Sequence, residues 1–264
     1  MCGLVGFTGA KDSTTLKAMT DSIIHRGPDD DGHLETDHFS IGYRRLAIID
    51  LTMSLYPLTN EDETIKVFLN GEIYNYQEIR RELIAAGHQF KTESDTEVIV
   101  HGYEEWGMNV IKRLRGMFVI VIYDSREDIL ILSRDRLGIK PLYYTEFNGR
   151  LIFGSEIKAL LKFPIDRIAD EHEVEKFLRY RVHDDTKNTF FKNIKRLMPG
   201  HNMVVDKDGN FRIEKYWSPT FSTKFASEKP DAEYASEFKE IFINAIDLHL
   251  IADVPVGVTL SGGL

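Results

Sequence analysis

The only cysteine of this 264-residue chain is Cys2, directly behind the initiator methionine. We expect Met1 to be removed because the second residue is small, which makes Cys2 the N-terminal residue of the mature chain. Its free α-amine, with an ordinary pKa of about 8, could then accept the proton of the thiol on the same residue. Cys2 is therefore a candidate nucleophile for acyl transfer. An inert thiol is the plain alternative, and a lipidation site is disfavoured because no signal segment precedes Cys2.

A thiolate that attacks an amide creates an oxyanion, and this charge needs hydrogen-bond donors. The stretch "FLNGEIYN" offers two donors, the side-chain NH₂ of Asn70 and the backbone N–H of Gly71. Asn-Gly is also the strongest short hairpin signal, but a helical pattern follows it instead of a second strand. We therefore expect Asn70 and Gly71 at the end of a strand, facing outward, as a candidate oxyanion hole.

An amide substrate with an amino-acid head group needs a cation for its α-carboxylate and an anion for its α-ammonium. Arg44 and Arg45 lie next to each other in "YRRLAIID", so only one of them can face the site if this stretch is a strand. Arginine suits the carboxylate because its guanidinium binds in a bidentate fork. Asp95, in "ESDTE", is expected in the first turn of a helix and could bind the ammonium.

Short apolar runs and amphipathic segments indicate the elements that position these residues. Hairpins are expected at 121–132 and 204–217, the second with an Asp-Gly turn. Ser94 and Glu97 have the spacing of a capping box, and Gly87 is a suitable helix end. Strands are predicted at 4–7, 41–49, 65–69, 117–123, 129–133, 151–154 and 256–260, and helices at 12–25, 77–87, 94–107 and 232–250. Paired strands with helices between them favour antiparallel sheets covered by helices.

Composition excludes several classes of function. The net charge is −9 and the apolar content is 42%, which is typical of a folded globular protein without a basic surface for nucleic acid. No apolar run is long enough to span a membrane, and one cysteine cannot form an internal disulfide. We expect a cytoplasmic protein with no membrane or nucleic-acid partner. No metal site is predicted, because the grouped residues His33, Glu35, Asp37 and His38 read as solvated surface.

Eight motifs, in order, resemble the glutaminase domain of glutamine-hydrolysing asparagine synthetases, which are class II, N-terminal-nucleophile amidotransferases. These motifs are "MCGLVGF", "HRGPDDDG", "RRLAIID", "LNGEIYN", "SDTEV", "LRGMFVIVIYD", "RDRLGIKPLYY" and "FGSEIKAL". The resemblance implies an α+β, four-layer αββα fold for a glutaminase domain at 2–205. A hairpin and linker would follow at 206–230, and the start of an incomplete α/β ATP-pyrophosphatase domain at 231–264.

The same resemblance implies roles for individual residues. Cys2 would form a glutamyl thioester and release ammonia, and Asn70 and Gly71 would form the oxyanion hole. Arg45 would bind the α-carboxylate of glutamine, and Glu72 with Asp95 its α-ammonium. Arg26 would lie in a loop beside the site. One departure is visible, because Ser54 and Tyr56 stand where the family has Gly and Gln, which puts the rate or the closure of the pocket in doubt.

The last residues, "VTLSGGL", resemble the start of the pyrophosphate loop of the family's synthetase domain. Thr259, Ser261, Gly262 and Gly263 would contribute to ATP binding in a complete protein, but the following helix and acidic residue are absent from this sequence. The glutaminase itself needs no cofactor, whereas ATP and Mg²⁺ are implied for the synthetase domain. The apolar face of the 232–250 helix would pack in that domain, and its exposure would reduce solubility.

The expected function is therefore hydrolysis of glutamine to glutamate and ammonia. In the complete enzyme the ammonia would amidate ATP-activated aspartate to asparagine. Two alternatives remain open: the same glutaminase serving another carboxylate, on a sugar or a peptide, and a catalytically silent interaction module. The retention of Cys2, Arg45, Asn70, Gly71 and Asp95 argues against the silent module. Acceptor specificity is not encoded in these residues, and a homodimer is left open.

Overall fold

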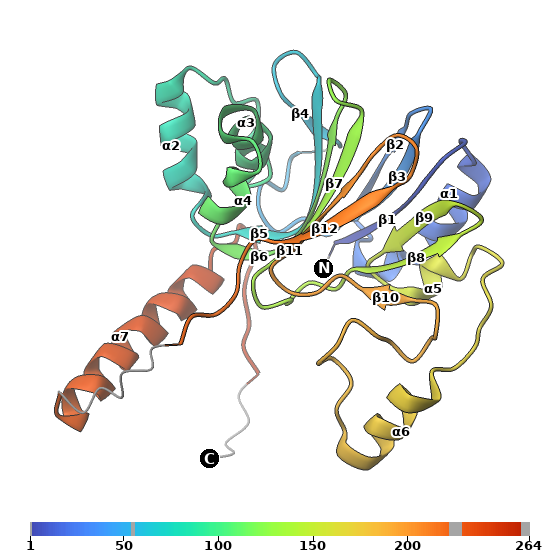
Figure 1. Cartoon of the computed structure of the whole chain (residues 1–264). Helices are drawn as coiled ribbons and strands as arrows, with labels where there is room; N and C mark the ends of the chain where they lie inside the picture. The colour runs from blue at the N-terminus through green and yellow to red at the C-terminus, as the bar shows by residue number, and fades with distance from the viewer. Residues whose placement is uncertain (1, 54–55, 222–228, 260–264) are drawn as a thin grey trace.

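Two six-stranded antiparallel sheets lie face to face in the structure, with helices on their outer sides (Figure 1). The structure is a computed structural model that describes residues 2–53, 56–221 and 229–259. The strands and helices together form four layers, so the predicted α+β, αββα architecture is confirmed.

The first sheet contains the strand that follows Cys2 at its centre. Its strand order is β10-β8-β9-β1-β3-β2, and every neighbouring pair is antiparallel. The strands are β1 (Gly3–Thr8), β2 (Asp30–Glu35), β3 (Phe39–Arg45), β8 (Tyr143–Phe147), β9 (Arg150–Gly154) and β10 (Lys195–Arg196).

The second sheet has the order β12-β11-β7-β6-β5-β4, again with antiparallel neighbours. Its strands are β4 (Leu58–Thr59), β5 (Ile65–Ile73), β6 (Gly116–Asp124), β7 (Ile129–Arg134), β11 (His201–Val205) and β12 (Phe211–Lys215). Both predicted hairpins, β6–β7 and β11–β12, are confirmed.

The helices cover the outer faces of the sheets (Figure 1). The first sheet is covered by α1 (Ser13–Asp21) and α5 (Ile157–Leu160), the second by α2 (Tyr76–Ala86), α3 (Glu97–Trp106) and α4 (Asn109–Arg113). A short 3-10 turn, η1 (Ile24–Arg26), follows α1, while α6 (Glu171–Tyr180) and α7 (Asp231–His249) project from the body (Figure 1). Within the described residues, no helix combines the length and apolar character that crossing a membrane requires.

Alternation along the strands divides the core into three apolar clusters. On β5, Val67 and Leu69 face the helices α2–α4, while Phe68 between them faces the other sheet. On β1, Leu4 faces the space between the sheets, and Val5 packs against the α1 and α5 side. This period of two is what a strand covered on both faces produces. The side chains of residues 2, 70 and 72 also point into the space between the sheets, because they lie an even number of positions from Leu4 or Phe68.

Several helix and strand limits were predicted correctly. Gly87 ends α2 in the left-handed conformation, with φ of 109°, and its N–H caps the carbonyl of Ile84. Gly87 is suited to this position because it has no Cβ. The strands β1, β6, β7 and β9 extend the predicted ranges by only one or two residues at their ends.

The predicted capping box at Ser94 and Glu97 is wrong, because α3 begins at Glu97. The Ser94 hydroxyl accepts a hydrogen bond from Thr96 N–H, but the Glu97 carboxylate does not return to Ser94. It accepts hydrogen bonds from the N–H groups of Lys91 and Thr92 instead. Glu97 therefore holds the preceding loop rather than capping its own helix.

The strand predicted at 41–49 ends early, because β3 stops at Arg45. Beyond it the chain turns back, and the carbonyl groups of Ile49, Asp50 and Met53 converge on the Arg45 guanidinium. The predicted strand at 256–260 is also not found, since residues 256–259 have no regular structure and Leu260 is outside the described residues. In the described part of the chain these residues have no neighbouring strand to pair with.

Candidate active site

A pocket opens between the two sheets at the end where β1 begins. It contains about 410 Å³ of space not filled by atoms, part of it open to solvent. Its wall includes Cys2 before β1, Arg45 at the end of β3, Gly71 and Glu72 on β5, and Asp95 before α3. The two sheets and the loop before α3 therefore bring together five of the predicted residues.

Cys2 is half-buried, and its thiol lies against the chain that follows β3. Its Sγ accepts a hydrogen bond from Leu46 N–H at 3.3 Å and lies 3.5 Å from the Leu46 carbonyl oxygen. Arg26 donates from Nε to the Cys2 carbonyl oxygen at 2.9 Å, so the backbone of the cysteine is fixed. Met1, whose removal we predict, lies outside the described residues.

The predicted placement of Asn70 and Gly71 at the end of a strand is wrong. β5 runs on to Ile73, and Asn70 and Gly71 pair with Val119 and Phe118 of β6. A Cβ on Gly71 would lie 2.0 Å from the Met117 carbonyl oxygen, so the close approach of β6 requires glycine here. The Asn-Gly signal therefore reflects tight strand packing and not a turn.

Asn70 is fully buried behind the pocket wall. Its Nδ2 lies 3.4 Å from Ser155 Oγ, and the same hydroxyl accepts a hydrogen bond from Leu4 N–H. The Asn70 Oδ1 atom is buried and makes no hydrogen bond. Gly71 does line the pocket, so the two residues lie side by side on β5 with different access to it.

Arg44 and Arg45 face opposite sides of β3, as their alternation predicts. Arg44 points outward and pairs with Asp21 and Asp31. Arg45 is 4% exposed and lines the pocket. Its Nη1 donates to the Met53 carbonyl at 2.6 Å, and its Nη2 donates to those of Ile49 and Asp50. The buried cation thus organises the loop that closes one side of the pocket.

Two buried carboxyl groups, those of Glu72 and Asp95, also line the pocket. Burial raises the pKa of Glu72, although the charge of Lys140 opposes this shift. Burial also raises the pKa of Asp95 to about 7, against the effect of the Ile73 N–H, which donates to its Oδ2 at 2.8 Å. Both shifts have the sign expected when a carboxylate loses its water, and a cationic ligand between the two groups would reverse them.

Lys140 and Tyr43 are pocket residues that the sequence reasoning missed. Lys140 is 3% exposed, and burial lowers its pKa while the charge of Glu72 opposes the shift. Tyr43 donates its hydroxyl to the Leu69 carbonyl and so joins β3 to β5 across the sheets. Lys140 lies between apolar residues in "LGIKPL", which is part of a motif of the family resemblance. The motif gave no indication of a role for the lysine itself.

Tyr56, which replaces the family's Gln, also forms part of the pocket wall. Its ring centroid lies 4.5 Å from that of Tyr43, and the Arg45 guanidinium carbon lies 5.7 Å from it. Burial raises the pKa of Tyr56 to about 12, so its hydroxyl stays neutral. Ser54, the other departure, lies outside the described residues.

The four residues predicted for ATP form no site in the described part of the chain. Thr259 is exposed and has no regular structure, and Ser261, Gly262 and Gly263 lie outside the described residues. The described segment 251–259 offers neither a strand nor a helix end that could bind a phosphate.

The surface group His33, Glu35, Asp37 and His38 does not converge on one point. His38 Nδ1 lies 2.5 Å from Asp128 Oδ2, and Asp37 pairs with Lys11. Glu35 accepts hydrogen bonds from the Ser13 hydroxyl. These contacts fit the solvated surface that we predicted.

Comparisons with known proteins identify the family of this chain. The family described as the glutamine amidotransferase domain matches residues 1–217. Asparagine synthetase [glutamine-hydrolyzing] 1 of Bacillus subtilis is 35% identical over 100% of this chain and 42% of its own length. Amidase chyE of Penicillium rubens is 34% identical over 94% of this chain and 37% of its own length. The chain thus spans about two fifths of the length of these relatives.

A solved structure shares the fold at low sequence identity. The glutamine phosphoribosylpyrophosphate amidotransferase from B. subtilis has a TM-score of 0.63 and 17% identity, over 83% of this chain and 50% of that one.

The region matched by the glutamine amidotransferase domain family ends at residue 217, just beyond β12, and it includes every described pocket residue. Together, the extent of this match and the shared fold show that the chain belongs to the glutamine amidotransferase domain family.

Proposed function

We propose that this domain hydrolyses glutamine to glutamate and ammonia, with Cys2 as the nucleophile. The observation that carries the proposal is the position of the only thiol of the chain. It lies in a pocket whose lining also contains the buried cations Arg45 and Lys140 and the two buried carboxyl groups of Glu72 and Asp95. These charges complement the α-carboxylate and the α-ammonium of an amino acid. The side-chain amide of the same substrate would then lie at the thiol.

Each residue would then have a defined role in binding glutamine. Arg45 would bind the α-carboxylate, because the three carbonyl groups around it hold the guanidinium in place. Glu72 and Asp95 would bind the α-ammonium, whose charge would favour the ionised form of both carboxyl groups. Tyr43 and Tyr56 would enclose the aliphatic part of the substrate.

The reaction would proceed by two acyl transfers. After removal of Met1, the α-amine of Cys2 accepts the thiol proton, and the thiolate forms a bond to the amide carbon. The amine returns the proton to the departing nitrogen, which leaves as ammonia, and a glutamyl thioester remains. Water then attacks the thioester, so that glutamate and the free thiol are released. The Gly71 N–H and the Asn70 amide would stabilise the oxyanion of both steps.

We further propose that the ammonia serves an acceptor in a longer protein of the asparagine synthetase kind, with ATP-activated aspartate as the acceptor. The support is the identity of 35% to the B. subtilis asparagine synthetase across the whole chain. The similarity to a protein named an amidase keeps a different carboxylate acceptor as the second candidate. In the longer protein, amide-¹⁵N glutamine should yield labelled asparagine in the first case and another labelled amide in the second.

The first test measures glutamate release from glutamine without ATP or acceptor. The purified chain, with Met1 shown to be absent by mass spectrometry, is compared with Cys2→Ala and Cys2→Ser. We expect both variants to lose activity by roughly 10³-fold or more, with unchanged thermal unfolding, because only the nucleophile is removed. Equal activity in Cys2→Ala would overturn the assignment of the nucleophile, and an inactive, folded wild-type chain would support the silent module.

A further inference from the structure

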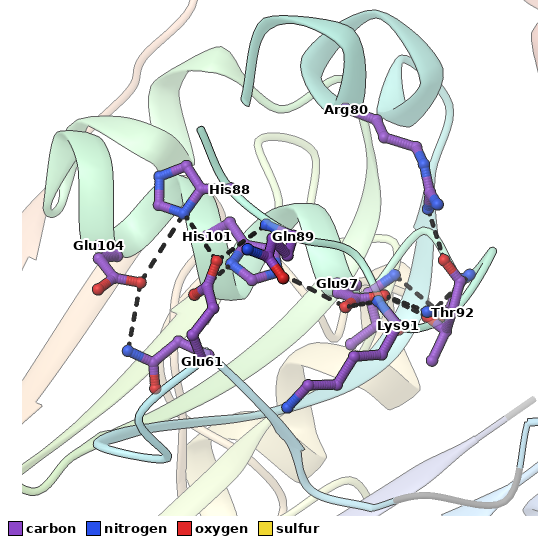
Figure 2. A network of polar contacts seen from close by, with 12 residues as sticks. Glu61, Arg80, His88, Gln89, Lys91, Thr92, Glu97, His101 and Glu104 are labelled. Carbon is purple, nitrogen blue, oxygen red and sulfur yellow. Dashed lines mark hydrogen bonds and ion pairs between the residues drawn. The ribbon is translucent and has the colours of Figure 1, made fainter. Parts of the chain in front are cut away.

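Four potential metal ligands converge outside the glutamine pocket, among α2, α3 and the β4–β5 turn (Figure 2). Glu61 lies in the turn, His88 directly follows the glycine that ends α2, and His101 and Glu104 lie three residues apart on α3. One donor atom from each of the four residues lies within 4.8 Å of all the others. Neither the family match nor the proposed glutamine chemistry assigns these residues a function.

His101 provides a second, independent observation. Its side chain is 1% exposed, and neither ring nitrogen makes a hydrogen bond of acceptable geometry. Glu61 Oε2 lies 3.2 Å from Nδ1, on the side of the cluster, and Glu97 Oε1 lies 3.5 Å from Nε2. The ring packs against Phe90 and His88, with centroids 4.6 and 5.0 Å away. Burying an imidazole without a hydrogen bond costs free energy. A metal ion bound between His101 Nδ1 and the carboxylates would give this nitrogen a partner.

Both histidines have the surroundings of metal ligands. The Nδ1 atom of His88 lies 3.5 Å from Glu61 and 4.0 Å from Glu104, while its Nε2 lies 3.5 Å from Glu105. His101 repeats this pattern, with Nδ1 toward the cluster and Nε2 toward Glu97. A carboxylate on the far ring nitrogen is the usual partner of a metal-bound histidine, because it fixes the tautomer and orients the ring.

The two carboxylate ligands are oriented as well. Gln89 N–H donates to Glu61 Oε1 at 2.9 Å, and Asn60 Nδ2 donates to Glu104 Oε2 at 3.2 Å (Figure 2). The side chains of Glu61 and Glu104 remain 37% and 30% exposed, whereas those of His88 and His101 are 11% and 1% exposed. The group is thus buried on the histidine side and open to solvent on the carboxylate side, which leaves a path for an ion.

The donors lie somewhat farther apart than the ligands of a bound zinc ion. Donors at about 2.0–2.1 Å from zinc are separated from one another by roughly 3.3 Å in a tetrahedron. His101 Nδ1 lies 3.2 Å from Glu61 Oε2, His88 Nδ1 lies 3.5 Å from Glu61 Oε1 and 4.0 Å from Glu104 Oε2, and the four donors lie within 4.8 Å of one another. Binding of the ion would draw these side chains together. Calcium and magnesium prefer oxygen ligands alone, whereas imidazole nitrogen with carboxylate oxygen suits zinc.

We propose that Glu61, His88, His101 and Glu104 bind one Zn²⁺ ion through Nδ1 of both histidines and one oxygen of each glutamate. The ion is structural, because it joins the β4–β5 turn, the segment after α2 and the helix α3. Its effect extends toward the glutamine pocket, since Glu97 contacts His101 and also holds the backbone of Thr92. Ser94 and Asp95, which line the pocket, follow Thr92 two and three residues later.

The test measures metal binding and stability in the full chain, after removal of metal with a chelator. Zinc is titrated in competition with a chromophoric chelator, and unfolding is followed with and without zinc. We expect one ion per chain with a Kd of roughly 1 μM or tighter, and a rise in Tm of about 5 °C at saturation. Cobalt in place of zinc should give the visible absorption of a tetrahedral ion.

Matched variants localise the site. We expect His101→Gln and His88→Gln to bind zinc at least tenfold more weakly, whereas His172→Gln, an exposed histidine on α6, should bind like the wild type. Because His101 is buried and its variant could fail to fold, Glu104→Gln provides a half-exposed ligand with the same expected loss. Absence of stoichiometric binding by the folded wild type, or equal binding by Glu104→Gln and His88→Gln, would overturn the proposal and leave an ion-pair network.

Discussion

The body of the molecule, through β12, and the segment that carries α7 differ sharply in how they bury apolar side chains. The body has three apolar clusters, on either side of each sheet and between them. α7 has no buried residue, and its large apolar side chains are widely exposed, with Phe238 at 67% and Ile241 at 69%. Both regions have strong hydrophobic patterns, so such a pattern predicts an element without showing that it is covered.

α7 contacts the body only near its C-terminal end, as far as the described residues show. The His249 ring lies 4.6 Å from that of Tyr74, and Asn244 accepts a hydrogen bond from Arg115. Beyond the helix, Asp253 bonds the loop after β3 in two places. α7 projects from the body in Figure 1, and its side chains Phe238, Ile241 and Phe242 are 54–69% exposed, so we expect this face to reduce solubility.

Two phenylalanine substitutions, one in the body and one in α7, test most directly whether the two regions differ in how their apolar side chains contribute to stability. Phe68 is fully buried between the sheets, and Phe242 on α7 is 54% exposed. Phe68→Ala should lower the free energy of unfolding by about 4 kcal/mol, because it leaves a cavity, whereas Phe242→Ala should change it by less than about 0.5 kcal/mol. Urea unfolding measures both values. A similar loss in the two variants would mean that α7 belongs to the same cooperative unit as the body.

Asp95→Asn should increase the free energy of unfolding of the body and weaken the proposed binding of glutamine. Burial raises the pKa of Asp95 from 3.8 to about 7, so the folded state binds more protons than the unfolded state between these values. Stability is therefore lost as the pH rises from about 4 to 7, and the variant avoids this loss. At pH 8 we expect its free energy of unfolding to exceed that of the wild type by roughly 4 kcal/mol, with little difference at pH 4.

The same variant should bind glutamine poorly, because the α-ammonium loses a carboxylate partner. The KM of the wild type should itself rise as the pH falls below about 7, where Asp95 becomes protonated. Glu93→Gln is the matched control, since the Glu93 side chain is 83% exposed two residues earlier and should show neither effect. A wild-type KM that stays constant between pH 6 and 8 would contradict the proposed role of Asp95.

Asp253→Ala tests whether the segment after α7 affects the pocket. The Asp253 carboxylate accepts a hydrogen bond from Asp50 N–H, next to the carbonyl groups that hold Arg45. Loss of this exposed contact should lower stability by less than about 1 kcal/mol and raise the glutamine KM a few-fold. Asp247→Ala on α7 removes the same charge without touching the loop and should leave the KM unchanged.

Ile241→Lys should have the smallest effect on folding and a visible effect on association. Because Ile241 is already exposed, unfolding should change by less than about 0.5 kcal/mol, while light scattering at high protein concentration should decrease. Glu240→Gln makes the same change in charge without removing apolar surface. Equal suppression of scattering by the two variants would assign the association to charge instead of the apolar face.

Local patterns in the sequence were sufficient for most of the fold. Alternation predicted that only one of Arg44 and Arg45 faces the site, the resemblance indicated Arg45, and Gly87 gave the end of α2. They failed where a distant strand decides the conformation, as at Gly71, whose neighbour Met117 is 46 positions away in the chain. The predicted strand after α7 failed for the opposite reason, because a strand needs a partner and the described chain provides none there.

The site was predictable only in part for the same physical reason. The resemblance placed Cys2, Arg45 and Asp95, which lie in contiguous motifs, and all three line the pocket. Lys140 and Tyr43 line it too; Tyr43 shares the face of Arg45 because it lies two residues earlier on the same strand, whereas nothing in the local sequence of Lys140 indicates burial. The cluster of Glu61, His88, His101 and Glu104 was not foreseen, because three separate segments must first fold together to form it.

Asp50 carries a consequence for how the pocket and the tail communicate. Its carbonyl accepts from Arg45, its carboxylate accepts from the N–H of Glu93, and its own N–H donates to Asp253. Linkage between two binding events is reciprocal. If bound glutamine shifts this loop, glutamine binding and the binding of Asp253 to the loop change each other's free energy by the same amount. Asp50, held at a positive φ of 53°, thus links Arg45 in the pocket and Asp253 in the tail through one loop.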